Sequence, residues 1–338
     1  MQAALDPSSG VPPWQRALQE AVRDPAELLR LLELDASQIA ELLPGARQAA
    51  QAFPLRVPRA FVARMRKGDP GDPLLRQVLP LGRELAPAPG YGADPVGDLA
   101  AMNVPGLLHK YEGRALLVVT GACAVHCRYC FRRHFPYGEA NPASGQWERA
   151  LDYLAAEPSL SEVILSGGDP LALPDERLAS LTARLAAIPH LRRLRVHTRL
   201  PVVLPERVDD ALLDWLAGTR LQPVLVLHAN HAQELDDSVR EALARLRGRG
   251  VTLLNQAVLL RGVNDSADAQ AALSEALFEA GVLPYYLHLL DRVAGAGHFD
   301  VDEAAARSIV DALRVRLPGY LVPRLVREVA GAPSKLPL

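Results

Sequence analysis

The sequence predicts an α/β fold in which an N-terminal helical region precedes a partial (β/α)6 barrel of TIM-like architecture. Three observations predict it. From residue 114 onward, short β-branched runs alternate about six times with longer amphipathic stretches, which indicates parallel βαβ units. Six units are too few for a complete eight-stranded barrel. Polar residues also cluster where the candidate strands end, and those ends carry the chemistry of βα barrels. A doubly wound open sheet is the alternative.

The first hundred residues have a different character. Residues 13 to about 66 repeat apolar side chains at spacings of three and four, which predicts helices. Between residues 67 and 104 the composition shifts to Gly and Pro, as in GDPGDP at 68–73, which is typical of turns and linkers. We therefore divide the chain into residues 1–103, a helical region with its linker, and residues 104–338, the barrel with a C-terminal segment.

Six strands and six helices make up the predicted barrel. The candidate strands lie at 114–120, 162–168, 193–199, 223–229, 252–259 and 284–290. The helical stretches lie near 147–156, 175–187, 206–217, 236–248, 267–280 and 301–316, and several end in Gly or Pro. The polar residues at the strand ends are Ser166, Asp169, His197, His228, Gln256 and Asp291. In a barrel these side chains meet at one end.

Composition indicates an ordinary soluble protein. The 338 residues include 37 Lys and Arg and 39 Asp and Glu, a net charge of −2, and 49% are hydrophobic. This balance argues against a nucleic-acid partner and against a disordered tail protein. Residues 1–10 have neither the basic nor the apolar part of a signal peptide, and no run of about 18 apolar residues occurs. We expect a cytoplasmic protein without a membrane partner.

All three cysteines lie within eight residues, directly after the first candidate strand. Cys123, Cys127 and Cys130 have the spacing C-x3-C-x2-C, and an odd, clustered set indicates metal or redox chemistry and not a disulfide framework. Three thiolates leave one metal position without a protein ligand, and such an open position can bind a substrate or cosubstrate. Two alternatives remain: three unreactive buried cysteines, or a structural zinc completed by His126 or His134.

The cysteine spacing in this position resembles the radical S-adenosylmethionine (SAM) superfamily. The resemblance implies a [4Fe-4S] cluster whose fourth iron is chelated by SAM, with reductive cleavage of SAM to a 5′-deoxyadenosyl radical. Tyr129 stands where an aromatic residue commonly precedes the third cysteine. Ser166, Gly167, Gly168 and Asp169 resemble the segment that binds the SAM amino group, although paired glycines after a strand also make a plain turn.

Longer segments resemble the lysine 2,3-aminomutase family, most closely the branch that serves elongation factor P. The matching stretches cover nearly the whole chain and are LRVPRAFVARMRKGDPGDPLLRQVLP (55–80), VPGLLHKYEGRALLVVTGACAVHCRYCFRRHFPY (104–137), ILSGGDPL (164–171), LNQAVLLRGVND (254–265), PYYLHLLDRVAGAGHF (284–299) and GYLVPRLVREVAGAPSKLP (319–337). The resemblance implies isomerisation of L-α-lysine to β-lysine, in the R configuration for that branch. It also implies pyridoxal 5′-phosphate (PLP) beside SAM, an external electron donor, and a separate ligase that attaches β-lysine to elongation factor P.

The resemblance implies four residues at the PLP site. Lys335, in the terminal PSKLP, matches the lysine that binds PLP covalently, although by its position alone it is a solvated tail residue. Tyr111 and Arg114 resemble the residues that hold the PLP phosphate, for which a hydroxyl and a cation are suited. The alternative to this role is a surface tyrosine and an arginine that begins a strand. Gln256 matches a strand glutamine that faces the cofactors, and a buried polar core residue is the alternative.

Three further residues match the substrate site of the family. Arg132 matches the arginine that pairs with the substrate carboxylate, which suits a guanidinium fork, and a surface cation is the alternative. Asp291 matches an aspartate that contacts the distal ammonium of lysine. Glu328 stands where the free-lysine aminomutases carry a second aspartate for the same group.

Two more departures from the free-lysine aminomutases favour the elongation factor P branch. Residues 331–334 (GAPS) replace a glycine-rich run, and no cysteines remain for an intersubunit zinc, so zinc-linked assembly is not expected. Two alternative functions remain open. One is an aminomutase that acts on free lysine or another amino acid in metabolism, and the other is a metal-binding regulatory protein without turnover.

Overall fold

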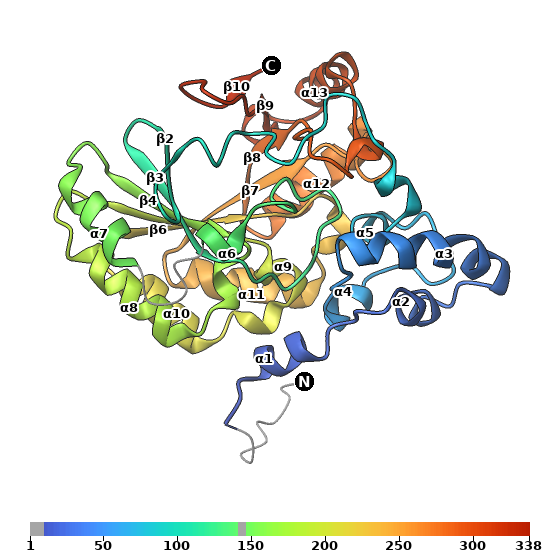
Figure 1. Cartoon of the computed structure of the whole chain (residues 1–338), viewed down its shortest axis with the longest axis horizontal. Coiled ribbons are helices and arrows are strands. Elements are labelled where there is room, and N and C mark those ends of the chain that lie inside the picture. Colours follow the sequence, from blue (N-terminus) through green and yellow to red (C-terminus); the bar gives the residue numbers. More distant parts are fainter. Residues whose placement is uncertain (1–9, 141–146) are drawn as a thin grey trace.

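A single sheet organises the molecule. The computed structural model describes residues 10–140 and 147–338, and within them ten strands form one sheet in the order β1 to β10 (Figure 1). The central strands run parallel, each paired with the next along the chain: β3 (Arg114–Thr120), β4 (Glu162–Gly167), β5 (Arg193–Thr198), β6 (Gln222–Leu227), β7 (Thr252–Val258) and β8 (Leu283–His288). This confirms the α/β partial barrel, in which the six predicted strands run parallel.

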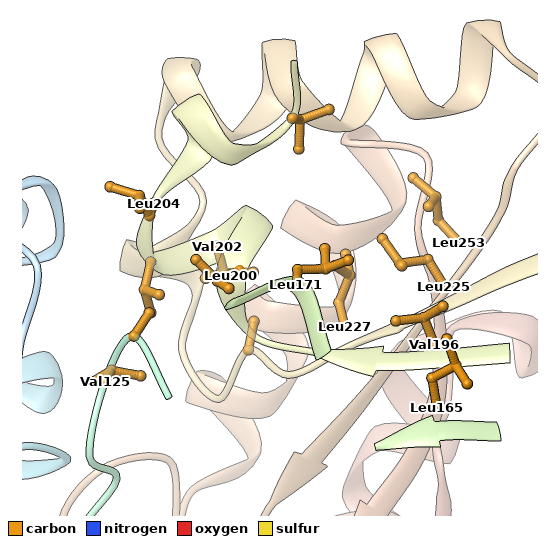
Figure 2. Close-up of a cluster of buried hydrophobic side chains, with 14 of the residues drawn as sticks. Val125, Leu165, Leu171, Val196, Leu200, Val202, Leu204, Leu225, Leu227 and Leu253 are labelled. Atoms are coloured by element: carbon orange, nitrogen blue, oxygen red, sulfur yellow. The ribbon is translucent and has the colours of Figure 1, made fainter. Parts of the chain in front are cut away.

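The register of the parallel strands follows from one buried row. Leu117 pairs with Leu165, Leu165 with Val196, Val196 with Leu225, and Leu225 with Leu253. These side chains are 0–4% exposed and pack against the covering helices, as Figure 2 shows for four of them. Because side chains alternate between the two faces of a strand, a one-residue slip would turn the whole row away from this core. The next residues along the strands therefore face the inner side of the barrel.

Helices follow the strands and cover the outer face of the sheet. They are α7 (Trp147–Ala156), α8 (Asp175–Ala186), α10 (Asp210–Ala217), α11 (Asp237–Gly248), α12 (Ala267–Glu279) and α13 (Glu303–Arg316). Four of them begin at an Asp or Ser whose side chain accepts a backbone N–H of the first turn: Asp209, Asp236, Ser266 and Asp302. Such caps satisfy N–H groups that have no partner within the helix. The helix bounds match the predicted ranges within a few residues.

Short helical elements fill the connections between strands and helices. They are α6 (Tyr137–Ala140), η3 (Pro170–Ala172), α9 (Leu200–Val203), η4 (Pro205–Arg207), η5 (Ala232–Glu234), η6 (Gly297–Phe299) and η7 (Gly319–Leu321). Most of these follow the C-terminal ends of strands. Side chains from α9 and from the cysteine loop (residues 121–135), among them Val125, join the same hydrophobic core as the strand residues (Figure 2).

Four strands at the edges of the sheet were not predicted from the sequence. β1 (Met102–Val104) and β2 (Leu107–Tyr111) run antiparallel beside β3. At the other edge, β9 (Arg324–Arg327) is parallel to β8 and β10 (Leu336–Pro337) is antiparallel to β9. These strands have only two to five residues, so they lack the longer apolar runs on which the prediction depended. They extend the parallel core on both sides.

The N-terminal region is helical but interrupted. Its elements are α1 (Pro13–Gln19), α2 (Pro25–Leu31), α3 (Ala36–Ala52), α4 (Arg59–Val62), α5 (Pro73–Arg76) and η1 (Gly82–Leu85). Leu74, Leu75 and Gln77, in the segment predicted as a linker, are fully buried. One hydrophobic cluster includes side chains of this region and of the barrel. The division at residue 103 stays a prediction, and the segment before it packs as part of the core.

No helix within the described residues has the length and apolar character that a membrane span requires. Residues 1–9, which entered the expectation that the chain lacks a signal peptide, lie outside the described residues.

Candidate active site

The cysteine loop begins where β3 ends and packs against the end of β4. The backbone N–H of Gly168 donates to the carbonyl of Thr120 at 2.7 Å, and that of Asp169 donates to the carbonyl of Ala122 at 2.8 Å. A Cβ atom on Gly168 would lie 2.4 Å from the Ala122 oxygen, and Gly167 has a φ of +120°. The paired glycines are therefore needed where two backbones meet. Contact of this segment with SAM stays a prediction.

The three thiols are free and partly buried in this loop. Burial, followed by the nearby Cys127, raises the pKa of Cys130 to about 11, and burial followed by Cys130 raises the pKa of Cys123. The thiols therefore share one electrostatic environment. Among residues 10–140 and 147–338, no group of three or more His, Cys, Asp or Glu side chains has the geometry of a preformed metal site. Three soft ligands on one loop form a donor set that suits iron, and the assignment of these three cysteines as its ligands stays a prediction.

The two histidines of the zinc alternative are each engaged with a backbone carbonyl. Nδ1 of His126 lies 2.9 Å from the carbonyl oxygen of Pro54, and its ring stacks on Phe53 with a centroid distance of 5.1 Å. Nε2 of His134 lies 3.1 Å from the carbonyl oxygen of Ala294. Both contacts lead away from the loop to other segments, so both rings hold the loop against its surroundings.

Asp169 fastens the end of β4 to the end of β5. Its carboxylate accepts hydrogen bonds from the Thr198 hydroxyl at 2.7 Å and from the backbone N–H groups of Leu171, Arg199 and Leu200 at 3.0, 2.8 and 3.1 Å. Burial nevertheless raises the pKa of Asp169. The predicted role in cofactor binding stays a prediction, because in this structure the carboxylate is engaged by the protein.

Five charged side chains form a continuous series of ion pairs, which we call the charge chain. Lys335 Nζ lies 2.6 Å from Glu328, Glu328 lies 3.0 Å from Lys110, Lys110 lies 2.6 Å from Asp98, and Asp98 lies 2.7 Å from Arg132. Each side chain is at most 22% exposed. The charge chain brings together three residues predicted for the site, Lys335, Glu328 and Arg132, although Lys335 is more than two hundred positions from Arg132 in the sequence.

Two members of the charge chain were not predicted from the sequence. Asp98 lies in the Gly- and Pro-rich segment, where an acidic residue looks solvated, yet it is 2% exposed. Lys110 is the residue before Tyr111 on β2, and its side chain bonds both to Asp98 and to Glu328. The resemblance could have indicated Lys110, because this residue lies within the matched segment 104–137. Asp98 lies outside the matched segments, so nothing in the sequence indicated its role.

Arg132 forms the cysteine-loop end of the charge chain. Its Nε bonds to Asp98 and one terminal nitrogen donates to the hydroxyl of Ser166 at 3.1 Å. Although burial opposes the charge, Asp98 and other groups raise the pKa of the Arg132 guanidinium. A fixed cation therefore lies at the end of β4, next to the cysteine loop.

Asp291 and Glu328 have opposite electrostatic situations. Burial, followed by the negative charge of Glu328, raises the pKa of Asp291 to about 7. Burial acts in the same sense on Glu328, but Lys335 and Lys110 outweigh it and lower the pKa of Glu328 to about 2. Glu328 is therefore ionised and paired. In the described part of the chain, no hydrogen bond or ion pair joins the Asp291 side chain to another residue, so it is the carboxylate available to a cationic ligand.

Tyr111 and Arg114 face each other across the turn between β2 and β3. They are cross-strand partners, and the Arg114 guanidinium lies 4.6 Å from the Tyr111 ring centroid. Burial, and then the negative charge of Glu328, raise the pKa of the Tyr111 hydroxyl. Arg114 begins β3 whereas the cysteine loop follows its end, a separation of about 20 Å along a seven-residue strand. The predicted phosphate site and the cysteine loop therefore lie at different levels of the barrel.

The inner face of the barrel carries imidazole and amide groups. Gln256 follows the buried Asn255 on β7 and projects to this face, half-buried. The pKa of His197 is lowered by burial and then by Arg195, and that of His228 is lowered by burial and then by Arg199 to about 3. Nε2 of both rings is buried, and the described residues give it no hydrogen-bond partner. Neutral rings with unused nitrogens are suited to accept or donate hydrogen bonds to a polar ligand.

The sequence is similar to those of known proteins. Residues 117–272 match the model of the radical SAM superfamily. The chain is 55% identical over 96% of its length to an L-lysine 2,3-aminomutase of Escherichia coli, of which it covers 94%, and 48% identical over 95% of its length to one of Haemophilus influenzae, of which it also covers 94%. It is 33% identical over 96% of its length to an L-lysine 2,3-aminomutase of Clostridium subterminale, of which it covers 77%.

Proposed function

Because the chain belongs to the lysine 2,3-aminomutase family of radical SAM enzymes, and is therefore an isomerase, we propose that it converts L-α-lysine to (R)-β-lysine for the modification of elongation factor P. The charge chain carries this proposal. It joins Lys335, which we assign to PLP, to Arg132, which we assign to the substrate carboxylate, within one buried cluster. The charges of Glu328 and Lys335 act on the pKa of Asp291, so Asp291 lies near the same cluster.

The donor groups suit the cofactors that the family implies. Cys123, Cys127 and Cys130 would hold three irons of a [4Fe-4S] cluster and leave the fourth to SAM. Lys335 would bind PLP, with Tyr111 and Arg114 offering a hydroxyl and a cation to the phosphate. When bound, the cluster with SAM supplies the one-electron chemistry that removes a substrate hydrogen, and PLP supplies the unsaturated centre that lets nitrogen migrate. The remaining task of the protein is to position the substrate and exclude water.

Substrate recognition is assigned to Arg132 and Asp291. The fixed cation of Arg132 suits the α-carboxylate of an amino acid. Asp291 suits the distal ammonium of lysine, because an unpaired buried cation costs several kcal/mol. Glu328 is already paired with Lys335 and Lys110, so its contribution to ammonium binding is secondary. The proposed reaction also needs an external electron donor.

A direct assay tests the proposed reaction. The anaerobically reconstituted protein, supplied with L-lysine, SAM, PLP and dithionite, is expected to form β-lysine, and chiral chromatography identifies the enantiomer. Addition of the ligase and elongation factor P is expected to give a mass increase of one lysyl group on the factor. Formation of the S enantiomer would contradict the branch, and formation of no β-amino acid from lysine would contradict the reaction.

Substrate choice is expected to depend on Asp291 and on pH. Asp291→Asn is expected to lower kcat/KM for lysine by about a hundredfold or more, since breaking a buried ion pair costs about 3–5 kcal/mol. SAM cleavage without lysine should fall far less. Because the pKa of the Asp291 carboxyl is about 7, this group is neutral below that pH and charged above it. The wild-type KM for lysine should therefore rise as pH falls through 7.

Kinetics of both proteins between pH 6 and 8 would measure this dependence. The Asp291→Asn variant should lack the change in KM, because its side chain has no proton to gain. The same dependence in the variant, or wild-type turnover of glutamate equal to that of lysine, would contradict the role of Asp291.

A further inference from the structure

A buried arginine touches one of the three thiols. Arg199, at the end of β5, places one terminal nitrogen 2.8 Å from Cys127 Sγ and 2.7 Å from the hydroxyl of Tyr129. Arg199 is 6% exposed, so water screens its charge little. The sequence did not single out this residue, because Arg199 and Cys127 are 72 positions apart. The contact gives the cysteine loop a fixed positive charge at its middle thiol.

A network from four separate segments holds the guanidinium in place. The second terminal nitrogen of Arg199 donates to Gln77 Oε1 at 2.7 Å and to Glu234 at 2.9 Å. Asn230, after β6, donates to the Tyr129 hydroxyl at 2.7 Å and to Gln77 at 3.0 Å. Gln77 belongs to the N-terminal region, whose role the sequence left open. Residues far from the cysteines in sequence therefore orient a cation toward Cys127.

The charges in this network are balanced by one carboxylate. Glu234 is fully buried, and Arg199 is its ion-pair partner. Although burial opposes its charge, Arg199 lowers the pKa of Glu234, so the carboxylate is ionised. The net field at Cys127 is thus the difference between a cation in contact with the sulfur and an anion on the far side of that cation. Removing either charge changes the field with opposite sign.

We propose that Arg199 is a positioning residue that raises the reduction potential of the cluster bound at Cys127, with Glu234 limiting the increase. This proposal rests on the proposed function, because it needs the cluster. Reduction adds one electron, from an external one-electron donor, to a centre that already carries thiolate charge. Net charge and hydrogen bonds to the sulfurs set the potentials of such clusters. A buried cation in contact with sulfur stabilises the reduced, more negative form over the oxidised form.

The test is a potentiometric titration of reconstituted protein, in which mediators and dithionite set the ambient potential and electron paramagnetic resonance measures the reduced cluster. Arg199→Gln, which keeps a donor without the charge, is expected to shift the midpoint negative. The reduced-to-oxidised ratio at fixed potential should fall about tenfold, or about 59 mV for one electron. Glu234→Gln should shift the midpoint positive. Arg199→Lys, which keeps the charge, should stay closer to the wild type than Arg199→Gln.

Arg207→Gln is the matched control. Arg207 is also a buried, ion-paired arginine, bonded to Asp175 at 2.7 Å, but it packs over Trp14 and not against a cysteine. Its replacement should leave the midpoint unchanged. The opposite signs for positions 199 and 234 separate an effect of charge from a general loosening, which would admit water and move both midpoints the same way.

Each outcome bears on the proposal. An unchanged midpoint in Arg199→Gln, or shifts of the same sign in the two variants, would overturn it. If Arg199→Gln does not retain iron, Glu234→Gln decides alone, and a zero or negative shift overturns the proposal. Wild-type protein that binds no four-iron cluster would overturn the proposed function itself, and this result is visible in the iron content before any titration.

Discussion

Replacement of Lys335 by alanine is expected to abolish amino migration while the iron content is unchanged. The chain has three lysines, so few residues can bind PLP covalently. Lys67 is about half exposed and pairs with Glu33 at the surface, whereas Lys110 and Lys335 share the carboxylate of Glu328. Without the amine of Lys335, turnover should fall by about a thousandfold or more, the scale of losing a group that acts covalently.

Borohydride reduction of the PLP-loaded protein, followed by peptide mapping, measures this directly. In the wild type the label should lie on the peptide that contains Lys335, and in Lys335→Ala the borohydride-sensitive visible absorbance should be lost. Lys67→Ala serves as the control and should behave as the wild type. Lys110 is the main alternative site for covalent binding of PLP, because it pairs with the same carboxylate, that of Glu328, as Lys335 does. Label on Lys110 in the wild type would show that the C-terminal assignment is wrong.

Replacement of any one of Cys123, Cys127 and Cys130 by alanine is expected to remove the four-iron cluster and all SAM cleavage. The chain has three cysteines, so no other thiol can substitute. Three thiolates and SAM supply one ligand to each of the four irons, so the loss of one thiolate leaves one further iron without a ligand. Each change removes only a sulfur atom from a small, partly buried side chain, so the fold should survive.

Iron and sulfide analysis, the broad absorbance near 400 nm, and anaerobic SAM cleavage measure the outcome, and circular dichroism with thermal unfolding checks the fold. A full cluster with SAM cleavage in any of these variants would contradict the assignment of that cysteine. Zinc in place of iron in the wild type, with no visible absorbance, would favour the structural-zinc alternative.

The regular elements of the barrel could be predicted because their signals are local. The row Leu165, Val196, Leu225 and Leu253 arises from apolar runs that are each bounded by turn residues, and any buried parallel strand needs such a run. Edge strands β1, β2, β9 and β10 could not be predicted, since each is too short to show an apolar run. They are strands because a neighbouring strand supplies their hydrogen-bond partners.

The sequence by itself determined the parallel α/β core, the clustered thiols and, through resemblance, the chemistry expected at Lys335 and Arg132. Only the tertiary structure decided that Asp98 and Lys110 join these two residues, that Gly168 is needed where two backbones meet, and that Arg199 touches Cys127. The physical reason is the distance along the sequence over which each kind of signal acts. Periodicity and spacing report on neighbours along the chain, whereas a buried charge is stable only beside an opposite charge, and the fold brings that partner from a distant segment.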